Sequence, residues 1–250
     1  MNAMYGMAAP GTFDRIVVVS PHFDDAALGA SHLLGAHPGS TVVTVFAGWP
    51  RTYPATPTEW DALGGFKAGD DVIALRREED RAAMAVLQAQ PVWLDFVDWQ
   101  YLEQHERSTP EQVAAELEPA LRAAEPTAVF VPMGIANPDH ETTHDAARLV
   151  IDRMPGVAWL AYEDNAYKHI PGMLAWRVSK LFHSGLWPTP AVVTAPPDAD
   201  RKRRAIHAYV SQIAPMERDH RLSTYLDAEV PEQYWQLAPP PAGWEGLTKR

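Results

Sequence analysis

Residues 15–37 read RIVVVSPHFDDAALGASHLLGAH, and this stretch decides the fold. Its first part, residues 15–20, is a short run of β-branched apolar residues, which is typical of a buried parallel strand. Residues 25–37 follow, with leucines at positions that fall on one side of a helix. The stretch therefore predicts a strand, a tight polar turn and a helix, which together form the first unit of an α/β fold.

The rest of the chain repeats this alternation of strands and helices. Apolar runs predict further strands at 41–47, 91–97, 127–133 and 157–162, and helices are predicted at 72–89, 110–125, about 138–154 and 198–213. Such alternation implies a mainly parallel sheet with helices on both faces. Ligands of these sheets bind outside the carboxyl ends of the strands, where the strand order reverses.

The length of the chain fits one domain. A chain of 250 residues can bury a sizeable α/β core but is short for two full domains. We expect residues 1–250 to form a single domain, with a Pro- and Trp-rich tail from about 231 that has no clear element. The polar segment 48–71 is long for a loop, so we expect it to join a binding site, where Trp49 and Trp60 could stack on a ligand or belong to the core.

The charge and the absence of cysteine narrow the function. With 21 basic and 32 acidic residues the net charge is −11, which repels nucleic acid and anionic lipid. The basic cluster of Arg201, Lys202, Arg203 and Arg204 is expected to be one solvated helix face. We find no signal-peptide pattern in the first 15 residues and no membrane span, so a cytoplasmic location is expected.

Because there is no cysteine, histidine and carboxylate must hold any metal, which suits Zn²⁺ and related divalent ions.

Two segments place imidazoles and carboxylates just after predicted strands. SPHFDD at 20–25 follows the first strand, and NPDH at 137–140 follows the strand that ends near 133. Together they offer His22, His140 and one of two adjacent aspartates, and a catalytic zinc site takes three protein ligands and a water. Asp, Asn and Pro are also favoured at helix starts. Capping does not explain a histidine in both segments.

The two adjacent aspartates, Asp24 and Asp25, can divide the work of hydrolysis. One carboxylate can bind the metal, while its neighbour takes the proton of the metal-activated water as general base. Asp139, beside His140, could orient a neighbouring imidazole as metal-site carboxylates do. We therefore interpret the two segments as one hydrolytic metal site.

A competing motif begins at His140. Residues 140–144 read HETTH and match the H-E-x-x-H pattern of zinc peptidases, in which both histidines bind zinc and the glutamate is the base. This alternative, a zinc metallopeptidase, would give these roles to His144 and Glu141. It leaves the first segment without a role. In the hydrolase interpretation Glu141 is a solvated acid, and His144 lies beside the site or at the surface.

The chain resembles the LmbE-like (PIG-L) family of zinc-dependent N-deacetylases. Members carry His-x-Asp-Asp after the first strand and Pro-Asp-His after a later one, matched here by PHFDD at 21–25 and NPDH at 137–140. An Arg-x-x-Glu helix matches at 76–79, and a late Lys-x-x-Ala-x-x-x-Tyr-x-Ser-Gln pattern matches at 202–212. The resemblance covers roughly residues 15–213 and implies a Rossmann-like fold.

The resemblance also implies roles for single residues. It makes His22, Asp25 and His140 the ligands of zinc or another divalent metal, Asp24 the general base, and Asp139 the carboxylate that tunes a catalytic imidazole. The implied reaction removes an N-acyl group, typically acetyl, from a small amino-sugar substrate or a related glycoconjugate. A zinc-binding member of the family with little catalysis is a further alternative.

Asn137 departs from the family pattern. Many members have histidine at this place, and that histidine is thought to stabilise the oxyanion or to protonate the leaving amine. A side-chain amide can donate a hydrogen bond to an oxyanion, but it cannot deliver a proton. We therefore expect Asn137 to hold the oxyanion, and the proton must come from Asp24 or from another group such as His144.

Two residues are expected to contact the substrate, Arg76 and Asp98. Arg76 lies on the helix predicted at 72–89, and Asp98 follows the next predicted strand, where family members place an acid. For Arg76, an ion pair on the helix surface with Glu79 or Asp80 is an equally simple explanation.

Overall fold

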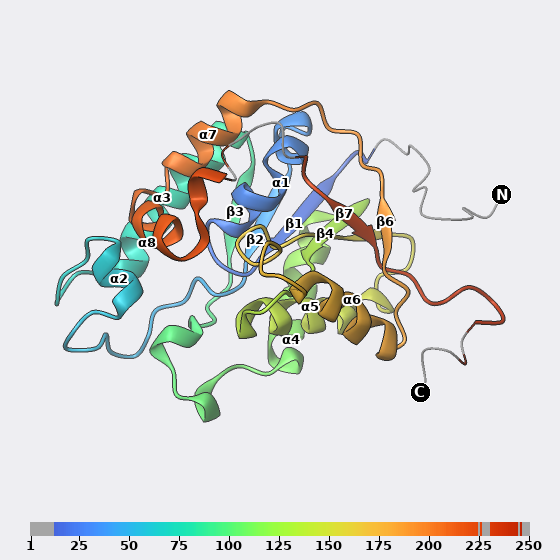
Figure 1. Ribbon diagram of the computed structural model, residues 1–250, viewed down its shortest axis with the longest axis horizontal. Helices are drawn as coiled ribbons and strands as arrows, with labels where there is room; N and C mark the ends of the chain where they lie inside the picture. Colours follow the sequence, from blue (N-terminus) through green and yellow to red (C-terminus); the bar gives the residue numbers. More distant parts are fainter. Residues whose placement is uncertain (1–12, 225, 227–230, 245, 247–250) are drawn as a thin grey trace.

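One sheet forms the centre of the protein in the computed structural model (Figure 1). The structure describes residues 13–224, 226, 231–244 and 246, and within them the sheet has seven strands in the order β3-β2-β1-β4-β5-β7-β6. The strands are β1 (Ile16–Ser20), β2 (Thr41–Thr44), β3 (Gln90–Trp93), β4 (Ala128–Pro132), β5 (Ala158–Tyr162), β6 (Thr189–Ala191) and β7 (Tyr234–Gln236). Residues 1–12, which include most of the segment searched for a signal peptide, lie outside the described residues.

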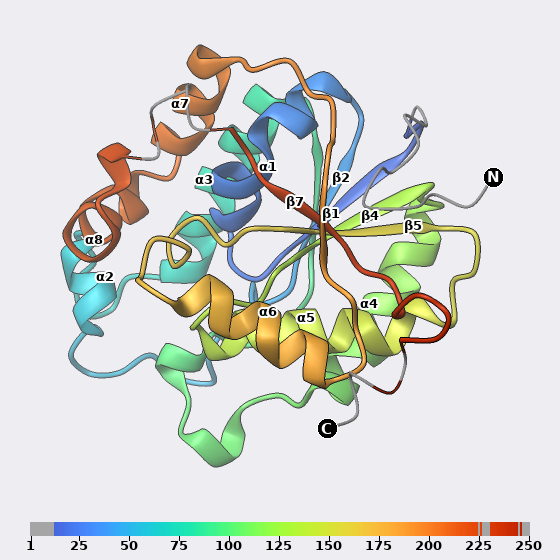
Figure 2. The same ribbon diagram turned by 45° about the vertical axis from the view of Figure 1, so that its right-hand side comes forward.

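Helices pack on both faces of this sheet (Figures 1 and 2). They are α1 (Asp25–Ala36), α2 (Glu59–Leu63), α3 (Val72–Leu87), α4 (Pro110–Ala124), α5 (Pro138–Ile151), α6 (Met173–His183), α7 (Ala199–His207) and α8 (Val210–His220), with short 3₁₀ turns η1 (Trp99–Tyr101), η2 (Gln104–Glu106) and η3 (Leu222–Thr224). Helices α1, α3 and α7 cover one face, and α4, α5 and α6 cover the other. The predicted α/β class with helices on both faces is confirmed.

The sheet is mainly parallel, as predicted. Strand β1 pairs in parallel with both β2 and β4, and β3 and β5 extend the sheet in parallel on either side. Strand β7 runs antiparallel to β5 and β6. Every residue of β1 is buried, and Val17 and Val18 join the cores on opposite faces of the sheet. Burial on both faces explains why this strand is a continuous apolar run.

The strand order reverses at β1, and this places the site. The chain leaves β1 toward β2 on one side, whereas β4 lies on the other side of β1. The carboxyl ends of β1 and β4 are therefore neighbours at the switch point, where α/β sheets bind ligands. The predicted segments 20–25 and 137–140 follow these two strands and meet there.

The predicted single helix at 198–213 is wrong, because the structure has α7 and α8 in its place. The break falls at Tyr209, with φ −85° and ψ 64°. The Tyr209 hydroxyl donates to Oδ1 of Asp80 over 2.7 Å, and the backbone N–H of Ser211 donates to Glu79 over 2.7 Å. These bonds to α3 hold the chain out of helical geometry at this point.

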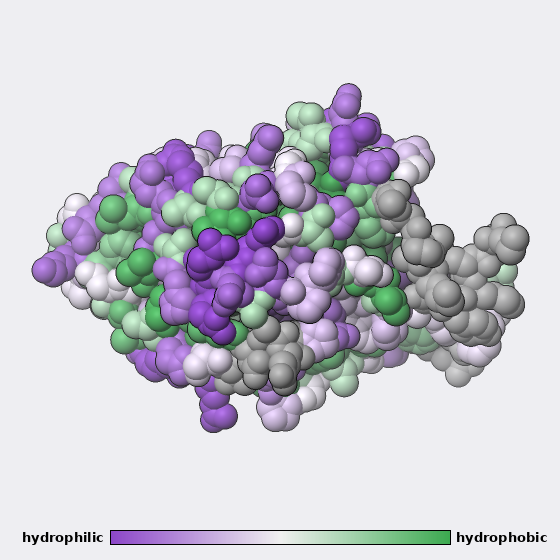
Figure 3. Space-filling model, turned by 90° about the horizontal axis from the view of Figure 1, so that it is seen from above, coloured by the Kyte–Doolittle hydropathy of each residue, from purple (hydrophilic) through white to green (hydrophobic). Residues whose placement is uncertain are grey.

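Several further elements were not predicted, among them α2 in the 48–71 segment, α6, and β7 in the tail. The tail also changes the interpretation of the basic cluster. Lys202 is buried, and its ammonium pairs with the Glu232 carboxylate over 2.9 Å, so the cluster is not one solvated face. Seen from the side of α7, the surface mixes hydrophilic and hydrophobic residues (Figure 3). None of the helices in the described part of the chain is long and apolar enough to cross a membrane.

Candidate metal centre

The turn after β1 is built by its own side chains. The Ser20 hydroxyl donates to the carbonyl of His22 over 2.5 Å and accepts from the backbone N–H of Ala26 over 2.9 Å. The backbone N–H of His22 donates to Oδ2 of Asp25 over 2.9 Å. These bonds close a tight turn that holds the imidazole of His22 and the carboxylate of Asp25 at the start of α1.

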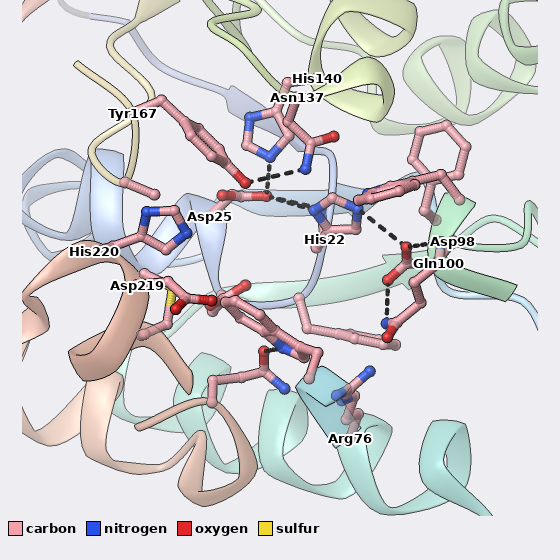
Figure 4. A pocket seen from close by; sticks show the side chains of 18 of the residues that line it. His22, Asp25, Arg76, Asp98, Gln100, Asn137, His140, Tyr167, Asp219 and His220 are labelled. Carbon is pink, nitrogen blue, oxygen red and sulfur yellow. Dashed lines mark hydrogen bonds and ion pairs between the residues drawn. The ribbon is translucent and has the colours of Figure 1, made fainter. Parts of the chain in front are cut away.

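The structure brings together the three residues predicted as metal ligands (Figure 4). Oδ2 of Asp25 lies 3.3 Å from Nδ1 of His22 and 3.1 Å from Nε2 of His140. One ligand atom from each of the three residues lies within 4.8 Å of the others. Two imidazole nitrogens and one carboxylate are a donor set that suits Zn²⁺ and related divalent ions, and they leave a further position open.

Each imidazole is held by a carboxylate on its other nitrogen. Nε2 of His22 lies 3.1 Å from Oδ2 of Asp139, and Nδ1 of His140 hydrogen-bonds to Oδ1 of Asp164. Such contacts fix the tautomer of a metal-binding histidine, so that the nitrogen facing the metal is free of a proton. The imidazole that Asp139 contacts is that of His22.

Sequence reasoning missed Asp164. This buried carboxylate accepts hydrogen bonds from the backbone N–H groups of Gly134 and Ile135, over 2.8 and 3.1 Å, as well as from His140. The residue follows β5, the next strand after β4 in the sheet. A carboxylate directly after a buried strand was the available signal, since the same signal had pointed to Asp25.

A second group of possible ligands shares His22. It consists of His22, Asp98 and Asp139, whose ligand atoms also lie within 4.8 Å of one another. Its contacts use Nε2 of His22, which lies 3.1 Å from Asp139 and 4.0 Å from Oδ1 of Asp98. With one imidazole and two carboxylates, this group serves to orient His22 while its Nδ1 faces Asp25.

The centre strongly favours positive charge. Burial lowers the pKa of His140, but the carboxylates of Asp25 and Asp164 outweigh it and raise the pKa to about 9. In the same way burial lowers the pKa of His22, and Asp98, Asp139 and Asp25 together raise it above its ordinary value. Burial raises the pKa of Asp25, and the two imidazoles reverse this and lower it. A divalent cation would occupy the place where these carboxylates now attract protons.

Asp24 faces the same pocket and is not used as a helix cap. It stands at the N-cap position of α1, yet its side chain makes no capping hydrogen bond. Burial, and then the neighbouring charge of Asp25, raise its pKa to about 7. A carboxylate with a pKa near neutrality, beside a metal centre, has the property that a general base needs.

Asn137 both caps a helix and lines the pocket. Its Oδ1 accepts from the backbone N–H of Asp139 over 2.8 Å at the start of α5, so the capping explanation is correct for this residue. Its Nδ2 donates to the hydroxyl of Tyr167 over 3.0 Å. The amide therefore keeps one N–H for another partner in the pocket.

The HETTH segment does not form a metal site in the described part of the chain. His144 is fully buried, and its Nδ1 bonds to the carbonyl of Pro132 over 2.8 Å. Burial, with the nearby charge of Arg177, lowers the pKa of His144 to about 3. Glu141 pairs with Lys180, away from the pocket. The expectation of a surface position for His144 was wrong, because its imidazole is buried and bonds to the backbone of β4.

Both predicted substrate residues line the pocket, Arg76 and Asp98. The partner of Arg76 is neither Glu79 nor Asp80, because its Nη2 bonds to Oδ1 of Asp61 over 2.8 Å in a buried ion pair. The Asp98 carboxylate accepts from the backbone N–H of Gln100 over 3.0 Å.

The two tryptophans of the 48–71 segment lie in different environments. Trp60 lines the pocket, and its indole N–H donates to Gln212 over 2.9 Å. Trp49 is 43% exposed, and the guanidinium of Arg77 stacks on its ring at 4.0 Å from the centroid. The segment therefore supplies one wall residue, as expected of a binding-site loop.

The other wall of the pocket comes from the later part of the chain, which the sequence left without a role. Tyr167, Asp219 and His220 line it together with Gln212. Gln212 belongs to the late family pattern, so a signal for it was available. Nothing in the sequence marked Tyr167 or His220, because each is an isolated residue with no motif around it.

Comparisons with known proteins agree with this geometry. The model of the PIG-L family, described as GlcNAc-PI de-N-acetylase, matches residues 17–151, more than half of the 250-residue chain. This range contains both motif segments and all three candidate ligands. The comparison with curated proteins found no match.

Solved structures share the whole fold. A deacetylase triple mutant from the teicoplanin biosynthetic pathway is 26% identical, with a TM-score of 0.73, and the match covers 92% of this chain and 100% of that one. An antimicrobial-reagent pseudoaglycone deacetylase is 25% identical, with a TM-score of 0.72, covering 90% and 98%. The N,N'-diacetylchitobiose deacetylase of Pyrococcus horikoshii, 18% identical with a TM-score of 0.54 over 91% and 85%, shares the fold. With the family model matched across both motif segments, the chain belongs to the PIG-L (LmbE-like) family.

Proposed function

We propose that the protein is a metal-dependent hydrolase that removes an N-acetyl group from a small amino sugar or a related glycoconjugate. One observation carries the proposal. His22, Asp25 and His140 converge in one pocket with the carboxylate of Asp24, which caps no helix. The pocket thus offers three metal ligands and a separate base, as hydrolysis of an amide by activated water requires.

The donor set fits a divalent metal ion such as Zn²⁺, with the carboxylates of Asp139 and Asp164 behind the two imidazoles. When bound, such an ion polarises the amide carbonyl and lowers the pKa of a water molecule. Asp24 accepts the proton of the attacking water. Its burial suits this role, because a pKa near 7 leaves the carboxylate able both to take a proton and to release it.

Asn137 is proposed to stabilise the oxyanion. Its Oδ1 is fixed by the backbone of α5 and one N–H is fixed by Tyr167, so the remaining N–H has a set direction. A donor that is fixed before the reaction stabilises developing charge better than one that must reorient. Tyr167 packs edge-on against His140, with 5.2 Å between the ring centroids, which holds this donor beside the metal ligands.

The walls of the pocket suit a sugar. Trp60, Trp99 and Tyr167 offer flat apolar surfaces, and Arg76 and Gln100 offer hydrogen-bonding groups. Ligand pockets commonly combine aromatic walls with a few polar groups that fix orientation. The teicoplanin-pathway, pseudoaglycone and N,N'-diacetylchitobiose deacetylases similar to this chain point to the same substrate class.

The test combines metal content with amine release. Elemental analysis of the wild type should give about one zinc per chain, and amine should be released from N-acetylglucosamine or N,N'-diacetylchitobiose. His22→Ala and His140→Ala should lose the metal, while the exposed His207→Ala is the matched control that keeps it. Asp24→Asn should keep the metal and lose turnover by at least about 100-fold. Full turnover in Asp24→Asn would remove the base from the proposal.

The same measurements separate the two alternatives. A metallopeptidase using HETTH would lose its metal in His144→Ala and would not depend on Asp24. A zinc-binding protein with little catalysis would hold the metal in the wild type and release no amine from either sugar. We favour the hydrolase because His144 is enclosed in the core and faces a backbone carbonyl.

A further inference from the structure

Amide hydrolysis needs a proton at the departing nitrogen, and the loop after β4 does not supply one. The amide of Asn137 has no acidic proton. His144 is enclosed in the core and does not line the pocket. A phenol such as that of Tyr167 is a weak acid, with an ordinary pKa of about 10, and its oxygen here accepts a hydrogen bond from Nδ2 of Asn137 over 3.0 Å. The proton therefore comes either from Asp24, after it has acted as base, or from another group that lines the pocket.

His220 lies in the same pocket, at the end of α8 (Figure 4). Its imidazole packs edge-on against Tyr167, with ring centroids 5.0 Å apart and planes at 76°. Trp60 flanks it at 6.0 Å. On its other side the Tyr167 ring contacts His140 at 5.2 Å, so this one ring contacts both imidazoles. His220 thus faces the pocket one side chain away from a candidate metal ligand.

The end of α8 favours a protonated imidazole. His220 is the last residue of this helix, where the helix dipole stabilises a cation. The neighbouring carboxylate of Asp219 also faces the pocket. Arg218 binds both oxygens of Asp219, over 2.5 and 2.7 Å, and lowers its pKa, so this carboxylate stays charged beside the imidazole.

Some groups on the other elements around His220 raise its pKa, and others lower it. Burial lowers the pKa of His220 below its ordinary value, and the positive charge of His140 on α5 adds to this. Asp219, the backbone of Ala166 and the carboxylate of Asp25 on α1 oppose the shift. The imidazole of His220 lines the pocket together with Ala166 and Tyr167. A lowered pKa makes the imidazolium a stronger acid toward a departing amine.

We propose that His220 is the general acid of this enzyme and protonates the leaving nitrogen, a role that rests on the proposed deacetylation. The water oxygen bonds to the carbonyl carbon while its proton passes to Asp24. The imidazolium of His220 then gives its proton to the amide nitrogen, and the C–N bond breaks with its electron pair on that nitrogen. The products are an amine and acetic acid, which ionises to acetate, while Asp24 releases its proton to solvent and His220 regains one.

The experiment compares two leaving groups in His220→Asn, with His207→Asn as the control at an exposed histidine. The amide probe is N-acetylglucosamine, with N,N'-diacetylchitobiose as a second amide, and the ester probe is 4-nitrophenyl acetate, whose phenolate leaves without a proton. We expect the ratio of amide to ester kcat to fall by about 10²–10⁴-fold in His220→Asn. The variant should keep the zinc content and the melting temperature of the wild type. Loss of the His220 proton should also lower wild-type amide turnover as pH rises, and this alkaline limb should disappear in the variant.

The outcomes distinguish this inference from the proposed function. An unchanged amide-to-ester ratio in a folded, zinc-loaded His220→Asn would overturn the inference and leave Asp24 as the group that returns the proton. An equal fall of amide and ester turnover would also overturn it, because it would give His220 a purely structural role. If the wild type releases amine from neither sugar, the proposed function falls and the inference falls with it.

Discussion

Replacing Asp164 by asparagine tests whether the carboxylates behind the imidazoles set the metal affinity. Oδ2 of Asp164 accepts from the backbone N–H groups of Gly134 and Ile135, and Oδ1 faces Nδ1 of His140. Both oxygens therefore meet donors. An asparagine has one oxygen and one NH₂ group in the same shape, so only one side of the site can keep its acceptor.

Either orientation of the amide has a cost. If the NH₂ group faces Gly134 and Ile135, two buried N–H groups lose their acceptor, at about 1–3 kcal/mol each. The other orientation costs less, and it points the NH₂ group at Nδ1 of His140. The imidazole must then accept there and carry its proton on Nε2, the nitrogen that faces Asp25. Metal binding must displace that proton.

We therefore expect Asp164→Asn to weaken zinc binding by roughly 10- to 100-fold, as losses of such carboxylates typically do. This corresponds to about 1.4–2.7 kcal/mol. Competition with a chromophoric chelator measures the affinity, and Asp152→Asn, at an exposed position just after α5, is the matched control. Turnover at saturating zinc should recover in part. Wild-type affinity in a folded Asp164→Asn protein would refute the tautomer argument.

Three further predictions concern the scaffold and the second motif. Burial raises the pKa of Asp80 to about 6, so the folded state binds its proton more tightly than the unfolded state and the free energy of unfolding falls by about 2 kcal/mol as pH rises from 4 to 7. Asp80→Asn should lose less stability than wild type between these pH values in urea titrations. Gly29→Ala puts a methyl group 2.5 Å from the ring of Tyr162 and should lower the free energy of unfolding by about 1–3 kcal/mol in the same assay. Glu141→Gln should keep wild-type zinc content and amine release, whereas loss of either would return the HETTH segment to consideration.

The first half of the site could be predicted because it depends on few long-range facts. Once residues 15–20 are a buried strand, the turn after it lies at the carboxyl edge of the sheet. The same holds for 137–140 after β4. Parallel strands end at the same edge of a sheet, and β4 lies beside β1, so His22, Asp25 and His140 meet there.

The sequence marks Asp164 as a carboxylate after a strand, but it does not show which residues that carboxylate contacts. Its role depends on β5 lying beside β4, which brings residue 164 to the backbone of Gly134 and to His140. Strand order is a global property that the local pattern does not contain. The break at Tyr209 has the same origin, since a hydrogen bond to Asp80 on another helix decides it.

The pocket is built from two parts of the chain, one inside the matched family range and one after it. This explains why the reaction class was easier to predict than the proton source. The matched family range, residues 17–151, holds the candidate ligands and Asp24. Tyr167 and His220 lie beyond it and wall the same pocket. All three candidate metal ligands therefore follow strands of the matched range. The proton and the substrate contacts depend on how the later helices fold back over the sheet. With an amide at position 137, an imidazole at the end of α8 supplies what the loop after β4 lacks.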